Sequence, residues 1–205
     1  MKIIRIGNFS IDEALKEAKR VLEKGGLVIV PTETVYGIAS KLEHARRIYK
    51  AKKRPRDKPL PVQTTLCDIE KVAQMNEKAR LLAKKFWPGP LTIVMKAKPT
   101  VPEVVTAGTG KVGVRVPAHP FTLRLLEMVG PLAVTSANLS GMKSPKSLEE
   151  VTVEADLAID AGPVSGTPST VVDVTGPQLK ILREGPIKRK DIERVIYGEN
   201  KDFLF

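Results

Sequence analysis

Cysteine, histidine and aromatic residues are scarce in this chain of 205 residues. The single cysteine, Cys67, excludes an internal disulfide framework and any metal site that needs several cysteines. The two histidines, His44 and His119, are too few for a histidine-rich metal site or an evident catalytic triad. We predict that both are structural, so proton transfer would fall to Asp, Glu or Lys. We therefore expect no metal site made by the protein alone and no organic cofactor.

Long apolar runs are also absent. The longest are far shorter than the roughly 20 residues of a membrane-spanning helix, and residues 1–5 lack the apolar segment of a signal peptide. No internal repeat, low-complexity segment or Gly/Ser linker divides the chain. We expect a cytoplasmic protein without membrane contact, folded as a single domain over residues 1–205 and followed by a short tail after its last helix.

Positive charge is abundant and concentrated in one segment. The formal net charge is +11, and residues 41–58 carry nine basic against two acidic side chains, a surplus of seven. Favourable placement at the end of a helix explains one or two of these charges, not seven. The surplus predicts a site for phosphate, either on a nucleotide or on RNA. The nine are Lys41, Arg46, Arg47, Lys50, Lys52, Lys53, Arg54, Arg56 and Lys58.

Apolar strand patterns alternate with helical patterns, which predicts an α/β fold. Strands are expected at 2–6, 27–30, 60–64, 91–95, 112–116, 131–134 and 157–160, with a hairpin formed by 169–174 and 179–183. Helices are expected from a cap at Ser10 to Gly25, at 42–52, 68–74, 76–86, 121–129 and 190–197, with a short helix capped by Ser147 and Glu150.

Small polar residues follow two of these strands. Thr32, Glu33 and Thr34 come after the buried run 27–30, which Pro31 ends, and a second polar stretch, 135–141, follows the strand at 131–134. Strand ends are the usual ligand-binding positions in open α/β sheets. Each stretch alone fits a capped turn equally well.

A glycine pattern at residues 108–113 matches the dinucleotide-binding fingerprint letter for letter. That motif requires a strand before it and a helix after it, whereas here it leads into a predicted strand. We therefore reject a dinucleotide site.

Arg115 lies in a predicted strand between Val114 and Val116. A buried guanidinium there needs a negative partner. The alternatives are a carboxylate of the protein and a bound anion, and we favour the bound anion.

Six motifs follow one another along the chain. They are Pro-Thr-Glu-Thr-Val-Tyr-Gly at 31–37, Lys-x-Arg-Pro at 52–55, Trp-Pro-Gly-Pro-Leu-Thr at 87–92, Val-Arg-Val-Pro at 114–117, Ser-Ala-Asn-x-Ser-Gly at 136–141, and Ser-Thr-Val-Val-Asp at 169–173 with Arg-x-Gly at 183–185. In this order they resemble the YrdC family. The resemblance covers nearly the whole chain.

The resemblance implies an α/β fold with a twisted mixed β-sheet, flanking helices and a basic concave face, without the second domain of the family's longer branch. It also implies threonylcarbamoyl-AMP synthase activity, in which L-threonine, bicarbonate and ATP are joined with release of pyrophosphate for a tRNA modification. The expected partners are ATP with Mg²⁺, L-threonine, bicarbonate, a downstream threonylcarbamoyl transferase complex, and tRNA or double-stranded RNA by direct contact.

The family's functional positions carry over to twelve residues of this chain. Catalysis is assigned to Lys52, Arg54, Ser136 and Asn138. ATP binding is assigned to Lys52, Arg54, Lys58, Lys111, Asn138, Lys146 and Arg183. L-Threonine binding is assigned to Thr34, Gln63, Arg115, Ser136 and Ser169.

Five positions depart from the family's common residues. Lys53, Lys58 and Gln63 stand where Gly, Asn and His are common, and Lys111 and Lys146 stand where threonine is frequent. The first two departures add positive charge, and Gln63 changes a contact on the threonine side.

Two other functions compete with the synthase. A non-catalytic module that binds double-stranded RNA or tRNA would use the same positive charge. Base recognition usually needs exposed aromatic residues, however, and only 4% of this chain is aromatic. A carbamoyl-transfer domain of the kind found in hydrogenase maturation is the third alternative, although such domains belong to much larger chains.

Overall fold

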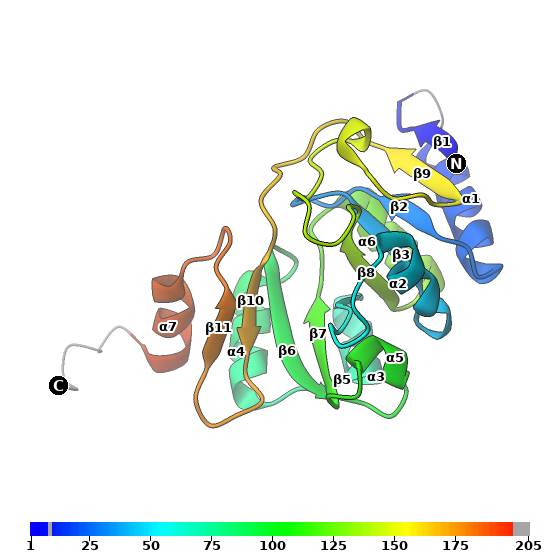
Figure 1. The fold of residues 1–205 in the computed structure, drawn as a ribbon. Coiled ribbons are helices and arrows are strands. Elements are labelled where there is room, and N and C mark those ends of the chain that lie inside the picture. Colours follow the sequence, from blue (N-terminus) through cyan, green and yellow to red (C-terminus); the bar gives the residue numbers. More distant parts are fainter. Residues whose placement is uncertain (8–9, 199–205) are drawn as a thin grey trace.

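One mixed sheet runs through the protein (Figure 1). The structure is a computed structural model that describes residues 1–7 and 10–198, so the expected C-terminal tail after residue 198 lies outside the described part. The strands are β1 (Lys2–Arg5), β2 (Val28–Val30), β3 (Gly37–Lys41), β4 (Val62–Gln63), β5 (Ala73–Gln74), β6 (Leu91–Ala97), β7 (Lys111–Arg115), β8 (Leu132–Ser136), β9 (Leu157–Asp160), β10 (Thr170–Asp173) and β11 (Lys180–Arg183).

The strand order is β1-β9-β2-β3-β8-β4-β7-β6-β10-β11, and β5 pairs with β6 beside this path. The sheet contains parallel pairs such as β4–β7 and β6–β10 and antiparallel pairs such as β3–β8 and β6–β7. The expectation of a twisted mixed sheet is confirmed. The sheet brings β8, β4, β7, β6 and β10 together although their residues are spread over more than half of the chain.

Helices cover both faces of the sheet (Figure 1). They are α1 (Ile11–Glu23), α2 (Arg46–Lys52), α3 (Ile69–Val72), α4 (Glu77–Phe86), α5 (Glu103–Thr106), α6 (Pro120–Val129) and α7 (Arg189–Tyr197), with single 3-10 turns at Leu42–His44, Leu66–Asp68 and Leu148–Glu150. None of the helices in this described part is long and apolar enough to cross a membrane.

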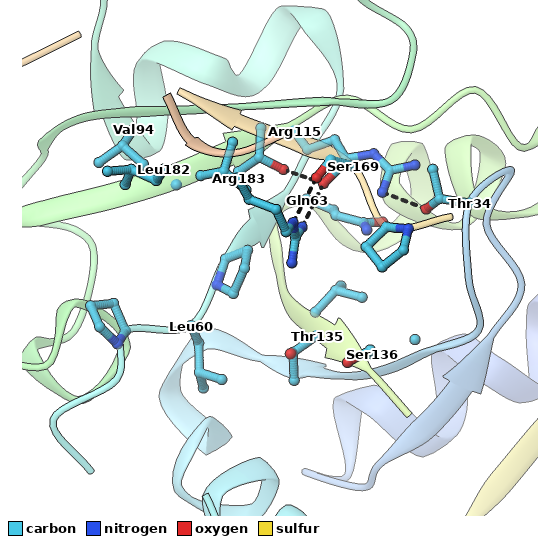
Figure 2. Close-up of a pocket in the computed structure, with 18 of the residues that line it drawn as sticks. Thr34, Leu60, Gln63, Val94, Arg115, Thr135, Ser136, Ser169, Leu182 and Arg183 are labelled. Carbon is cyan, nitrogen blue, oxygen red and sulfur yellow. Dashed lines mark hydrogen bonds between the residues drawn. The ribbon is translucent and has the colours of Figure 1, made fainter. Parts of the chain in front are cut away.

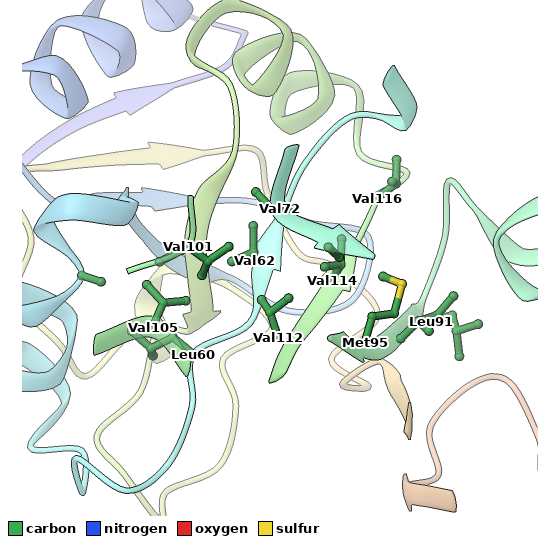
Figure 3. Packing of buried hydrophobic residues seen from close by; sticks show 14 of the residues in the cluster. Leu60, Val62, Val72, Leu91, Met95, Val101, Val105, Val112, Val114 and Val116 are labelled. Carbon is green, nitrogen blue, oxygen red and sulfur yellow. The ribbon is translucent and has the colours of Figure 1, made fainter. Parts of the chain in front are cut away.

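Two hydrophobic clusters form the core. The smaller one joins α1 and α6 to one face of β2, β8 and β9, and includes Leu15, Phe121 and Leu125. The larger one lies on the other face, under α2, α4 and α7, and part of its packing around β4, β6 and β7 is drawn in Figure 3. Because adjacent side chains of a strand point to opposite faces, Ile29 joins the larger cluster while Val28 and Val30 join the smaller one. The strand at 27–30 is therefore buried on both faces, as its sequence predicts.

The helix cap expected at Ser10 is confirmed. The Ser10 hydroxyl accepts a hydrogen bond from the Glu13 amide, and the Glu13 carboxylate accepts one from the Ser10 amide. The similar pattern at Ser147 predicts a cap that is absent. Residues 148–150 form only a 3-10 turn without a side-chain cap, and the Glu150 carboxylate accepts a hydrogen bond from the Lys146 amide at 2.9 Å instead of from Ser147.

Two further expectations are corrected. Residues 68–74 do not form one helix, because Ala73 and Gln74 leave the helical turn and pair with Ala97 and Lys96 of β6 as strand β5. The strand β3 was not expected at all. Its residues 37–41 have no clear apolar alternation, and they are extended because β2 and β8 pair with them on either side.

Candidate active site

A cavity of about 460 Å³ opens over the central strands, and Figure 2 shows the side chains around it. Residues of β4, β6, β7, β8, β10 and β11 line it, together with the turn that follows β2. Eight of the twelve predicted site residues are among them: Thr34, Arg54, Gln63, Lys111, Arg115, Ser136, Ser169 and Arg183. Sequence motifs that are far apart along the chain therefore meet in one place.

Arg115 is buried at the end of β7, with 5% of its surface exposed. Its Nη1 donates a hydrogen bond to the Thr34 hydroxyl at 2.8 Å, and its Nε donates one to the carbonyl oxygen of Gly89 at 3.2 Å. Its Nη2 lies 2.6 Å from Oε1 of Glu33, an ion pair whose alignment is not that of a hydrogen bond. The turn after β2 thus supplies the negative partner. A protein carboxylate is therefore one partner of Arg115, and the expectation that Arg115 also holds a bound anion stays a prediction.

The guanidinium keeps donor capacity toward the cavity. Five N–H groups are available on an arginine, and the contacts to Thr34, Gly89 and Glu33 engage three directions. The Thr34 hydroxyl is itself fixed, because it lies 3.0 Å from the Thr32 hydroxyl, which donates to the carbonyl oxygen of Val35 at 2.6 Å. A guanidinium that is held in place and still has free N–H groups can bind a carboxylate ligand.

Ser169 and Arg183 form a second polar group in the same cavity, with Ser169 close to Arg115 (Figure 2). Arg183 donates from Nε to the carbonyl oxygen of Ser169 at 2.9 Å and from Nη2 to its hydroxyl at 3.2 Å. The same hydroxyl lies 2.9 Å from the Thr92 hydroxyl. Burial lowers the pKa of Arg183, and the positive charge of Arg115 lowers it further. Two guanidinium groups that destabilise each other across one cavity favour an anion between them.

Lys52 does not line this cavity. Its side chain is buried, with 1% of its surface exposed, and its ammonium donates hydrogen bonds to the carbonyl oxygens of Ser136 and Asn138. It therefore ties the end of α2 to the polar stretch after β8. A phosphate role for Lys52 remains a prediction, and in this structure its donors are directed at backbone carbonyls.

The buried ammonium predicts a pH-dependent stability. Burial, and then the charge of Arg54, lower the pKa of Lys52 from 10.5 to about 8. Between these values the unfolded chain binds more protons than the folded chain, so the free energy of unfolding should increase with pH by at most about 1.4 kcal/mol per unit. Urea unfolding of the wild type and of Lys52→Met at several pH values in this window measures the effect. Equal pH slopes for both proteins would contradict it.

Arg54 lines the cavity from the segment after α2. Its Nε donates to the carbonyl oxygen of Lys58 at 3.2 Å, its Nη2 donates to that of Pro59 at 2.9 Å, and burial lowers its pKa. Nη1 has no hydrogen-bond partner among residues 1–7 and 10–198. Arg54 is thus held in place with one end open to a ligand.

The other three predicted residues lie outside the cavity lining. Lys58 and Lys146 are exposed, and they would have to swing in to reach a ligand. Asn138 is buried, and its Nδ2 donates to the carbonyl oxygens of Leu139 and Met142. Its Oδ1 is buried without a hydrogen-bond partner in the described part of the chain, which leaves it free to accept one from a ligand.

The cavity also contains residues that the sequence did not single out as site residues. Thr92 and Asp173 belong to two of the matched motifs, and this membership was the sequence feature that could have identified them as site residues. Burial raises the pKa of Asp173, but hydrogen bonds from Thr175 and the Lys111 ammonium, 3.0 Å away, outweigh this and lower it. Val94, Val134, Val171 and Leu182 form an apolar wall. Strand alternation alone does not show that such side chains face a cavity instead of the core.

Comparison with known proteins shows which family this chain belongs to. The family model Sua5_yciO_yrdC, described as telomere recombination, matches residues 20–185. The chain belongs to the Sua5/YciO/YrdC family. The resemblance found in its motifs is confirmed.

Curated relatives match most of this chain. The threonylcarbamoyl-AMP synthase of Pyrococcus abyssi is 40% identical over 193 residues, which are 89% of this chain and 57% of that protein. The synthase of Bacillus subtilis is 39% identical over 199 residues, 90% of this chain and 57% of that protein. The chain therefore spans little more than half the length of these two relatives.

A solved structure has the same fold. The crystal structure of P. abyssi Sua5 complexed with L-threonine matches with a TM-score of 0.88 at 37% identity, covering 96% of this chain and 61% of that one. The YrdC-like fold expected from the sequence is confirmed.

Proposed function

We propose that this protein is an L-threonylcarbamoyladenylate synthase, which condenses L-threonine, bicarbonate and ATP to threonylcarbamoyl-AMP and pyrophosphate. The observation that carries the proposal is that two guanidinium groups, that of the buried Arg115 and that of the exposed Arg183, line one cavity together with small hydroxyl residues. Relatives with 39–40% identity are named for this activity, and the related Sua5 structure holds L-threonine.

L-Threonine would bind at the Arg115 end. The remaining N–H groups of Arg115 would donate to the substrate carboxylate, while the hydroxyl groups of Thr34 and Ser169 lie close to the same space. Gln63 is buried on β4 with an Oε1 that has no hydrogen-bond partner in the described part of the chain. That oxygen would accept a hydrogen bond from the threonine hydroxyl, where relatives commonly use a histidine.

ATP would bind across the rest of the cavity. Arg183, Lys111 and Arg54 supply positive charge for the phosphates, and the apolar wall of Val94, Val171 and Leu182 suits an adenine ring. Exposed Lys58 and Lys146 would close on the phosphates. Asn138 Oδ1 would accept from the nucleotide after a small shift of its loop.

The reaction needs mainly positioning and charge stabilisation. The amine of threonine attacks the carbon of bicarbonate and water leaves, which gives a carbamate. A carbamate oxygen then attacks the α-phosphorus of ATP, the bond to the β-phosphate bridging oxygen breaks, and pyrophosphate leaves. Ser136, at the end of β8, lies in the lining where the two substrates would meet. The guanidinium groups balance the charge of the departing pyrophosphate.

Mg²⁺ would accompany ATP. Asp173 is the only carboxylate among the described lining residues, and no group of three or more His, Cys, Asp and Glu in the described residues could hold a metal. This donor set fits an ion held mainly by phosphate oxygens and water, as Mg²⁺ often is. When bound, the ion would neutralise charge on the phosphates. We also infer a cytoplasmic location, with tRNA and a downstream threonylcarbamoyl transferase complex as partners.

Pyrophosphate release tests the proposal. Release from ATP, Mg²⁺ and bicarbonate should depend on L-threonine, and mass spectrometry should detect threonylcarbamoyl-AMP. Serine at the same concentration is the matched control for the methyl group of threonine. Absence of threonine-dependent release, together with salt-sensitive binding of double-stranded RNA, would replace the synthase with the RNA-binding alternative.

A further inference from the structure

A second cavity, of about 750 Å³, lies between the end of α2 and α5. Five basic residues and a single acidic residue, Glu103, line it, a surplus of four positive charges. The basic residues are Arg46, Lys50, Lys53, Arg54 and Arg56. Arg54 is the one lining residue that this cavity shares with the candidate active site. The two cavities are therefore neighbours that meet at Arg54.

Most of these cations have no partner in the described part of the chain. Within residues 1–7 and 10–198, the side chains of Arg46, Lys50, Lys53 and Arg56 take part in no hydrogen bond and no ion pair. Their neighbour Arg47, in contrast, donates to the carbonyl oxygen of Gly25 and pairs with Asp156 at 3.1 Å. Four unpaired cations around one cavity repel each other, and an anion that binds among them relieves the repulsion.

Lys53 has a backbone conformation that is unfavourable for a lysine. It follows the last residue of α2 with φ 48° and ψ 41°, the left-handed region in which glycine and asparagine are favoured. The Lys53 amide donates to the carbonyl oxygen of Lys50 at 3.2 Å, as any residue there could, but the lysine side chain forms no hydrogen bond in the described structure that would offset the cost. Its charge is thus presented to the cavity at the expense of stability, a combination typical of functional sites.

The residues that line this second cavity can bind phosphate, but they offer no surface on which a nucleobase could stack. Tyr49 is the only aromatic residue among the described lining residues, it is buried, and its hydroxyl lies 2.9 Å and 3.0 Å from the carbonyl oxygens of Lys58 and Val104. It therefore offers no open face for stacking. The remaining lining residues, Val104, Ala107 and Gly108, are small and apolar. Recognition here depends on charge.

We propose that this second cavity is an anion site for pyrophosphate, separated from the active site by Arg54. That the anion is pyrophosphate rests on the proposed function, in which this molecule is released beside Arg54. Pyrophosphate is short and carries on the order of three negative charges near neutral pH, which matches the surplus of cations. Arg54 would contact ATP on one side and the released product on the other, so product binding and ATP binding are coupled through one side chain.

The substitution Lys53→Gly tests the anion site without destabilising the fold. The change relieves the left-handed backbone and removes one charge, so the melting temperature should stay the same or rise by up to about 3 °C, while pyrophosphate affinity falls about threefold. Isothermal titration with magnesium-free pyrophosphate at constant ionic strength measures the affinity. The double variant, Lys53→Gly with Lys50→Ala, should bind pyrophosphate about tenfold more weakly than the wild type.

Two variants serve as matched controls. Ala107→Gly relieves the other non-glycine residue of the described chain that has a positive φ, at φ 50° in the same cavity, without changing charge. Lys85→Ala removes one exposed lysine from α4, outside this cavity. Both should bind pyrophosphate as the wild type does.

The titration does not depend on turnover, so a chain that proves inactive as a synthase can still bear out the anion site. Equal pyrophosphate affinity in Lys53→Gly and Ala107→Gly would overturn the proposal. So would a Lys53→Gly defect that appears with a short double-stranded RNA and not with pyrophosphate, which would make the cavity a contact for a nucleic-acid backbone.

Discussion

Replacing Arg115 with alanine should lower the free energy of unfolding by about 3–5 kcal/mol, because it leaves the Glu33 carboxylate buried without its positive partner. Both carboxylate oxygens of Glu33 are buried, and the Arg115 guanidinium lies 2.6 Å from one of them. The hydrogen bond to the Thr34 hydroxyl is lost as well. Urea unfolding at pH 7 measures the loss.

The same variant should lose threonine-dependent pyrophosphate release. Two charge-assisted hydrogen bonds to the threonine carboxylate would disappear, which corresponds to a loss of at least about 100-fold in kcat/KM for threonine. The KM for ATP should change much less, because Arg183 and Arg54 remain in the cavity.

A double variant distinguishes the two effects. In Arg115→Ala with Glu33→Gln the unpaired charge is gone, so most of the stability should return while threonine-dependent release stays lost. Glu33→Gln alone should retain activity, since Thr34 and Gly89 still hold the guanidinium. If the single and double Arg115 variants unfold at the same urea concentration, Glu33 and Arg115 do not balance each other as this structure indicates.

Features set by neighbouring residues were predictable from the sequence. The buried strand β2 ends at Val30 because Pro31 follows it, and α1 begins where Ser10 and Glu13 form a capping box. These patterns act over a few residues, so they are visible without knowledge of the fold. The family motifs extended this to the candidate site, because eight of the twelve residues that they selected line one cavity.

Features set by distant contacts were not predictable from local patterns. Strand β3 depends on partners on both sides, and β5 depends on the end of β6. The positive charge of Lys52 is evident from the sequence, but its target is not, because Ser136 and Asn138 lie 84 and 86 residues further along the chain. For the same reason a local pattern identified Arg115 as needing a negative partner without showing that Glu33 provides it.

Replacing Gly185 with alanine should affect both the fold and the site. A Cβ atom at this position would lie 2.3 Å from the carbonyl oxygen of Pro168, 2.8 Å from the Thr170 amide nitrogen and 2.9 Å from the Ser169 carbonyl carbon. All three are backbone atoms, which cannot turn away as a flexible side chain can. The backbone at 168–170 must therefore shift, at a cost of about 1–3 kcal/mol in the free energy of unfolding.

This backbone shift would also displace the Arg183 side chain in the cavity, because Ser169 holds the Arg183 guanidinium. The Arg183 guanidinium donates to the carbonyl oxygen of Ser169 at 2.9 Å and to its hydroxyl at 3.2 Å, and both residues line the cavity. A displacement of about 1 Å in such a group lowers turnover about 100-fold. The Gly185→Ala variant should thus be folded at room temperature but nearly inactive in threonine-dependent pyrophosphate release.

Gly176→Ala is the matched control, since Gly176 lies in the turn that joins β10 to β11 and Gly185 follows β11. Its added Cβ would meet only the carbonyl oxygen of Gln178, at 3.9 Å, which is an ordinary contact. Its stability should stay within about 0.5 kcal/mol of the wild type, and its activity should be unchanged. Wild-type turnover in Gly185→Ala would mean that the Ser169–Arg183 contact can move without consequence, and that Arg183 does not need this position to act on ATP.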